Sequence, residues 1–161
     1  MQIIVNSHNS KEGDYVSSQK KNKTIALCLQ PHSSIKSIMH DLINHDFPDY
    51  TLIDHSISCS WMSSFSELEE EALYKMIVNF NPVLMILDDS FASKVFKDLD
   101  EDYRDFQNTF KLESLFIIHK KSGNFTSTPH LTLTHPDKIS KPFLKHFLKK
   151  KLCLNNLEVM L

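Results

Sequence analysis

Two acidic residues and a histidine stand where a predicted sheet would expose them. Asp88 and Asp89 directly follow the apolar run Val83–Leu87, and His119 directly follows Leu115–Ile118. In parallel α/β sheets, ligands bind beyond the carboxyl ends of the strands. Carboxylates in that place can bind a divalent cation, and a carboxylate beside a histidine can serve acid–base chemistry.

Several other site types are excluded by composition. The 161 residues include only 2 glycines, Gly13 and Gly123, so a phosphate-binding glycine loop, a dinucleotide fingerprint and a nucleophile elbow are all absent. Nine histidines and three cysteines are present, but none has the His-x-x-x-His or Cys-x-x-Cys spacing of a zinc site. The sequence therefore predicts no structural metal.

The elements that would position Asp88, Asp89 and His119 alternate along the chain. Apolar runs predict five strands, at 25–29, 50–53, 83–87, 115–118 and 131–134. One-sided apolar spacing predicts helices over 35–43, 68–80, 91–99 with a continuation to 110, and 143–152. Ile3–Val5 is a candidate for a short added strand. The alternation predicts one doubly wound parallel α/β sheet of five strands with helices on both faces.

Two stretches carry a resemblance to a known family. Asn81–Asp88 resembles the central strand of response-regulator receiver domains, in which the last aspartate accepts a phosphoryl group. Ile139–Phe143 resembles the Lys-Pro-Phe signature that opens the last helix of that family. The element order from Lys23 to Leu152 also matches, with a reduced fourth helix, because residues 120–130 lack a helical period. The resemblance implies a flavodoxin-like, receiver-like fold.

The resemblance also implies roles for particular residues. Asp88 is then the candidate phosphoacceptor, Lys141 is the lysine that pairs with the phosphate, and His119 holds the position of the switch hydroxyl. Asp89 is a candidate Mg²⁺ ligand. The family's metal-binding acidic pair after the first strand is replaced by Gln30-Pro31, which offers one neutral amide and no second side-chain oxygen.

Three functions remain open at this point. The favoured interpretation is a stand-alone, degenerate receiver that is not an enzyme, needs no cofactor and acts through protein–protein interaction. The alternative is a genuine response regulator, phosphorylated on Asp88 by a histidine kinase with Mg²⁺. A further alternative is a small α/β hydrolase that uses Asp88, Asp89 and a nearby histidine.

Charge and chain ends suggest where partners would bind. The last helix is rich in lysine, whereas segments near 67–71 and 98–105 are acidic. In receivers the last helix commonly forms partner or dimer interfaces, so a signalling partner, or a homodimer through this helix and the apolar tail, is expected there. The net charge of −2 gives no reason to expect nucleic acid.

The chain is expected to divide into three parts. These are a flexible N-terminal segment over 1–22, a receiver-like domain over 23–152, and a C-terminal tail over 153–161. No apolar run is long enough for a membrane span or a secretory signal, which favours a cytoplasmic protein.

Overall fold

The computed structural model describes residues 2–5, 23–55, 66–96, 99–119, 128 and 130–160. The strands are β1 (Gln2–Val5), β2 (Thr24–Cys28), β3 (Thr51–Asp54), β4 (Leu84–Asp88), β5 (Glu113–Ile117) and β6 (Leu131–Thr134). The helices are α2 (Ser34–Asp46), α4 (Ser66–Phe80), α5 (Asp89–Val95), α6 (Leu99–Phe110) and α7 (Lys141–Met160), with a short 3₁₀ turn η1 (Pro136–Lys138).

All six strands form one parallel sheet in the order β1-β3-β2-β4-β5-β6. From β2 the chain moves outward to β3 and then returns past β2 to β4. The strand order therefore changes direction between β2 and β4, which is the place where open α/β sheets usually bind ligands. The five strands β2 to β6 give the flavodoxin-like arrangement, and β1 extends its edge beyond β3.

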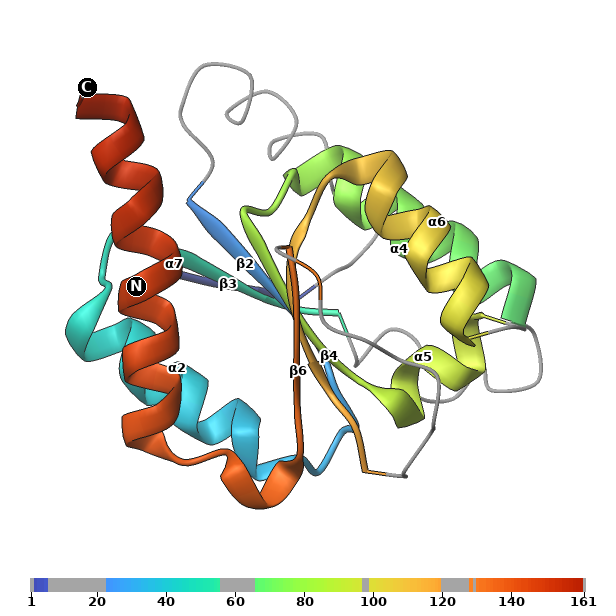
Figure 1. Ribbon diagram of the computed structural model, residues 1–161, viewed down its shortest axis with the longest axis horizontal. Helices are drawn as coiled ribbons and strands as arrows, with labels where there is room; N and C mark the ends of the chain where they lie inside the picture. The colour runs from blue at the N-terminus through green and yellow to red at the C-terminus, as the bar shows by residue number, and fades with distance from the viewer. Residues whose placement is uncertain are drawn as a thin grey trace.

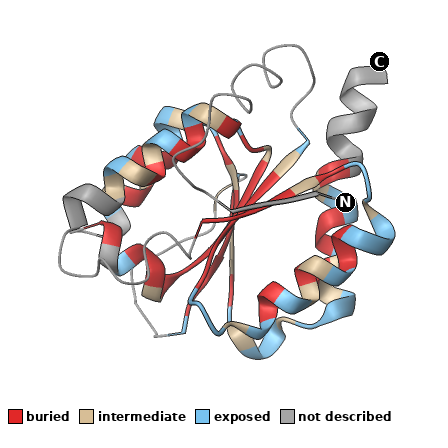
Figure 2. Cartoon of the chain, turned by 180° about the vertical axis from the view of Figure 1, so that it is seen from behind, coloured by how far each residue is buried: buried red, intermediate tan, exposed pale blue. Residues whose placement is uncertain are grey.

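Helices cover both faces of the sheet (Figure 1). Successive side chains of a strand point to opposite faces. Ile25 and Leu27 of β2 therefore pack with α2 and α7, whereas Ala26 and Cys28 pack with α4, α5 and α6. All four side chains are fully buried, as are most other strand residues (Figure 2). The continuous apolar run in β2 thus reflects burial on two faces.

Local signals explain where several helices begin and end. Ser33 caps α2 by accepting a hydrogen bond from the Ile35 backbone N–H at 3.3 Å. Asn81 ends α4 with a positive φ of 44°, a conformation that asparagine tolerates better than most residues. Phe47 follows the last turn of α2, directly before Pro48.

The predicted α/β fold is confirmed, with some changes in bounds. The added N-terminal strand is present, so part of the segment 1–22 belongs to the sheet. The helical stretch after β4 is two helices, α5 and α6, and α7 runs on through most of the expected tail. Residues 6–22 and 56–65, and nearly all of the expected helix-poor segment 120–130, lie outside the described residues.

No helix in the described part of the chain is both long enough and apolar enough to cross a membrane.

Candidate functional site at the carboxyl edge of the sheet

Buried polar side chains gather where β3 and β4 end. Asp54 and His55 close β3, and Asp88 and Asp89 join β4 to α5. Asp88 is 2% exposed, and His55 is fully buried. Because a buried polar group without a partner is costly, the partners of these side chains decide what the edge can do.

Asp88 uses both carboxylate oxygens to hold backbone groups. Its Oδ1 accepts from the Phe91 N–H at 2.8 Å, which makes Asp88 the N-cap of α5. Its Oδ2 accepts from the Gln30 N–H at 3.2 Å, across the point where the strand order reverses. Burial raises the pKa of Asp88, although these two hydrogen bonds oppose that shift.

Asp89 holds His119 at two points. Asp89 Oδ2 accepts from the His119 backbone N–H at 2.9 Å, and Asp89 Oδ1 lies 2.9 Å from His119 Nδ1. The Asp89 side chain is 11% exposed and the His119 side chain is 42% exposed. The pair therefore joins a nearly buried carboxylate to an imidazole that reaches solvent.

A second charged pair lies at the end of β3. Lys36, in the first turn of α2, reaches Asp54 Oδ1 at 3.3 Å, and both side chains are about nine-tenths buried. The neighbouring His55 packs edge-on to Phe91 with ring centroids 6.0 Å apart. Burial lowers the pKa of His55 to about 4, so this imidazole is neutral at physiological pH.

The structure pairs Lys141 with Asp41 instead of Asp88. Lys141 Nζ lies 2.8 Å from Asp41 Oδ2, and both side chains are more than half exposed. This hydrogen bond raises the pKa of Lys141 and lowers the pKa of Asp41. Of the four residues selected from the sequence, the structure thus brings together Asp88, Asp89 and His119, and it leaves Lys141 on the α2–α7 surface.

The side chains at this edge do not fit a Mg²⁺ ion. Both carboxylate oxygens of Asp88 accept hydrogen bonds from backbone N–H groups, and both oxygens of Asp89 bind His119. Gln30 contributes its backbone N–H, which is a hydrogen-bond donor and cannot bind a cation. Within the part of the chain that the structure describes, no three histidine, cysteine, aspartate or glutamate side chains lie close enough together to hold a metal ion. An octahedral site needs several oxygen ligands arranged around one point, and the described residues do not provide such a group.

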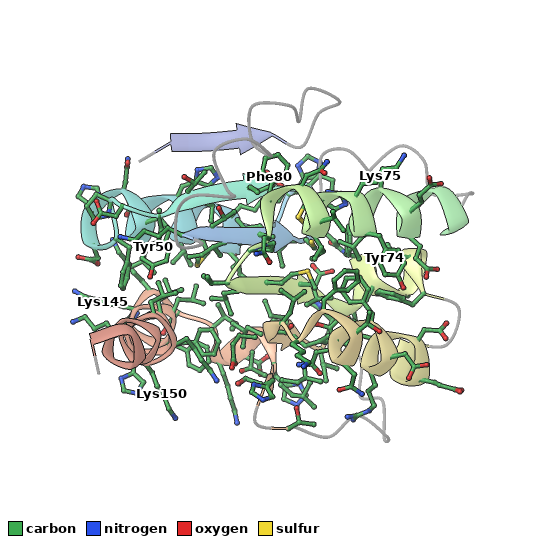
Figure 3. The ribbon with its side chains drawn as sticks, turned by 90° about the horizontal axis from the view of Figure 1, so that it is seen from above. Tyr50, Tyr74, Lys75, Phe80, Lys145 and Lys150 are labelled. Atoms are coloured by element: carbon green, nitrogen blue, oxygen red, sulfur yellow. The ribbon has the colours of Figure 1, made fainter. Side chains whose placement is uncertain are left out.

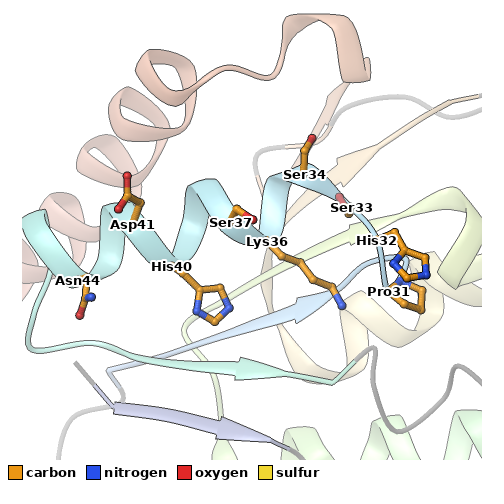
Figure 4. A pocket seen from close by; sticks show the side chains of 9 residues that line it. All are labelled: Pro31, His32, Ser33, Ser34, Lys36, Ser37, His40, Asp41 and Asn44. Atoms are coloured by element: carbon orange, nitrogen blue, oxygen red, sulfur yellow. The ribbon is translucent and has the colours of Figure 1, made fainter.

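A solvent-open hollow of about 650 Å³ lies along α2. Lys36, His40 and Asn44 project into it from the same side of the helix (Figure 4). Its lining combines hydroxyl, amide, imidazole, ammonium and carboxylate groups, so no one charge dominates it.

Comparisons with protein-family models, with curated proteins and with solved structures found no match to this chain.

The groups at the end of β3 were not selected from the sequence. Asp54 and His55 directly follow the predicted strand 50–53, so the rule that selected Asp88 and His119 would also have selected them. Lys36 carried no such signal, because a lysine in the first turn of a helix is usually solvated and only the fold places it against Asp54.

Proposed function

We propose that this protein is a stand-alone, receiver-like signalling module that acts by binding partner proteins and does not use Mg²⁺-dependent phosphorylation of Asp88. The proposal combines the flavodoxin-like sheet with the resemblance of Asn81–Asp88 and Ile139–Phe143 to receiver motifs. It assigns Asp88 a structural role as a helix cap.

The hydrogen bond from Gln30 to Asp88 is the observation that carries this proposal. A phosphoacceptor aspartate must present one oxygen to the donor and a second to the metal ion. Here one oxygen faces the β2–α2 connection and the other faces the first turn of α5. Phosphorylation would break at least one of these bonds in a site that is 2% exposed.

The cations of α7 support binding as the mode of action. The segment Lys141–Leu152 contains five lysines and no acidic residue. Three of these lysines are bound within the fold, to Asp41, Asp46 and Glu113. Lys149 and Lys150 are exposed and make no ion pair with any residue that the structure describes. Figure 3 shows Lys145 and Lys150 pointing away from the sheet. A surface of this kind suits an acidic protein partner.

The test is incubation with acetyl phosphate and Mg²⁺, followed by intact-protein mass spectrometry before and after alkali, which cleaves acyl phosphates. We expect no phosphoryl group that alkali removes. The Asp88→Asn variant is the matched control. An alkali-sensitive gain in mass that this variant loses would overturn the proposal and make Asp88 a working phosphoacceptor.

Binding needs a separate measurement. A partner captured from cells by the tagged protein would be purified and titrated against the wild type, the variant Lys149→Glu/Lys150→Glu, and Asp88→Asn. We expect weaker binding for the charge reversal and unchanged binding for Asp88→Asn, with or without acetyl phosphate. A partner that binds only after acetyl phosphate treatment, and only when Asp88 is present, would contradict the proposal.

A further inference from the structure

Two histidine–carboxylate pairs lie at opposite ends of β5, and they differ in an informative way. At the carboxyl end, Asp89 holds both the backbone and the ring of His119. At the other end, His130 Nδ1 lies 2.9 Å from Glu113 Oε1, but Glu113 is 26% exposed and also binds Lys151 at 3.1 Å. Only the first pair combines a nearly buried carboxylate with a ring fixed at two points.

This geometry determines which ring nitrogen of His119 is available. An ionised carboxylate only accepts hydrogen bonds, so Nδ1 carries the proton that Asp89 accepts. In the neutral imidazole, Nε2 then holds the lone pair. Because the His119 side chain is 42% exposed while its carboxylate partner is 11% exposed, a reactant can approach the ring without disturbing Asp89.

A second imidazole stands on the neighbouring strand. His135 follows β6, and its Nδ1 lies 3.2 Å from the backbone oxygen of Ile118, the residue before His119. The carbonyl also only accepts, so His135 is held through Nδ1 as well. A second imidazole therefore lies at the edge where α/β sheets bind ligands.

We propose that His119 is a nucleophilic imidazole that accepts a phosphoryl group on Nε2 from a small acyl phosphate or phosphoramidate donor. This inference stands on the Asp89–His119 pair and does not depend on the proposed function. The proposed reactive group lies at the end of β5, which neighbours β4 and Asp88. Both carboxylate oxygens of Asp88 accept hydrogen bonds from backbone N–H groups.

The transfer step balances without a further reactant. The Nε2 lone pair of His119 attacks phosphorus, and the bond from phosphorus to the donor oxygen or nitrogen breaks. With acetyl phosphate the leaving group departs as acetate with the bonding electron pair; with phosphoramidate it departs as ammonia after taking a proton from solvent. The ring keeps its Nδ1 proton and becomes cationic, and the Asp89 carboxylate at 2.9 Å offsets that charge.

The test uses the full chain with phosphoramidate, which donates to imidazoles, and follows the intact mass with time. Phosphohistidine is labile in acid but stable in alkali, whereas an acyl phosphate on Asp88 is cleaved by alkali, so treatment with alkali distinguishes the two. We expect one acid-labile phosphoryl group, lost in His119→Gln and formed at least about tenfold more slowly in Asp89→Asn, since the carboxylate no longer supports the cationic ring. His130→Gln is the matched control and should react like the wild type.

Each other outcome has a definite meaning. Equal labelling of several histidines, or a loss in His130→Gln equal to that in His119→Gln, would overturn the inference. An absence of any acid-labile group would also overturn it, while leaving the proposed function intact. A group that alkali removes and that disappears in Asp88→Asn would overturn the proposed function, and the test of His119 would then rest on the phosphoryl group that is stable in alkali and labile in acid.

A second measurement does not depend on reactivity or on a variant that folds. Long-range ¹H–¹⁵N correlation spectra of the wild type assign the tautomer of each histidine. We expect the Nδ1–H form for His119, with Nε2 unprotonated. The opposite tautomer would contradict the proposal, because Nε2 would then lack its lone pair.

Discussion

The carboxyl edge of the sheet and the α2–α7 surface both hold charged pairs, but they hold them in different ways. At the edge, Asp88 is 2% exposed and binds two backbone N–H groups. On the surface, the Asp41 and Lys141 side chains are both more than half exposed and bind each other in contact with solvent. The receiver motif would have joined Asp88 and Lys141 in one site, and the fold separates them into these two regions.

This difference indicates which charges the fold depends on. A buried carboxylate that satisfies backbone donors cannot be removed without leaving those donors unpaired. An exposed ion pair is replaced by water and salt when it is lost. We therefore expect substitutions at the edge to affect folding and substitutions on the surface to affect recognition.

The largest expected effect is a pH dependence from His55. The pKa of this residue falls from 6.5 in the unfolded chain to about 4 in the fold. Between pH 6.5 and pH 4, His55 binds a proton in the unfolded chain but not in the folded chain. The free energy of unfolding therefore decreases as the pH falls through this range, by about 3 kcal/mol in total. Urea unfolding at several pH values should show it in the wild type, and His55→Phe should lack that part of the slope. An identical slope in both proteins would show that His55 is not buried in its neutral form.

The next effect is the loss of the Asp88 cap. Asp88→Ala removes two hydrogen bonds and leaves the Gln30 and Phe91 N–H groups unpaired, which we expect to cost roughly 2 kcal/mol in the free energy of unfolding. The matched control is Ser33→Ala, which removes a cap with a single hydrogen bond and should cost less. Equal decreases in the free energy of unfolding would contradict the expectation that the second hydrogen bond of Asp88 adds to the stability of the fold.

The stability of the wild type and of Asp88→Ala should also differ in its dependence on acidic pH. Burial raises the pKa of Asp88, so the folded chain binds this proton before the unfolded chain does. Its protonation therefore favours folding as the pH falls, in the direction opposite to His55. Asp88→Ala should lack this gain at acidic pH.

An effect of similar size is expected from the charged pair at the end of β3. Lys36→Met leaves the Asp54 carboxylate without its ammonium partner and should cost about 2 kcal/mol, less than for a fully buried pair because both side chains are about one-tenth exposed. Lys75→Met is a close control, because Lys75 binds Glu71 at the same 3.3 Å but with both side chains more than 60% exposed. Urea unfolding should separate the two variants, and indistinguishable midpoints would mean that burial does not strengthen the Lys36 pair.

The smallest effect is expected from Lys141. Lys141→Ala removes an exposed ion pair, and we expect the unfolding midpoint to remain within experimental error of the wild type. Thermal unfolding at low and high salt would check this. A clear drop in the midpoint that high salt does not diminish would show that the α2–α7 surface also supports the fold.

The sequence was sufficient to predict the sheet and the edge, because both depend on patterns of apolar residues. Continuous apolar runs identified the strands, and the rule for carboxyl ends then selected Asp88, Asp89 and His119. The strand bounds differed by at most two residues, whereas several helix bounds differed by more. Asp88 closes β4 and also caps α5.

The partners of these residues could not be predicted, because they depend on the paths of the connections. The resemblance assigned Lys141 to a phosphate site, but residues 135–140, including η1, separate it from the end of β6. Lys141 therefore begins α7 and faces Asp41 on α2. The bond from Gln30 to Asp88 joins residues 58 positions apart, and no local pattern indicates it.

That long-range bond has a consequence for the order of folding. Helix α5 has only 7 residues, far fewer than the roughly 12 to 15 that an isolated helix needs to persist in water. The aspartate that caps it also closes β4, which pairs with β2, and its second oxygen binds the Gln30 amide. We therefore expect the helicity of α5 to depend on assembly of the central strands, and hydrogen exchange of the Phe91 amide would follow it.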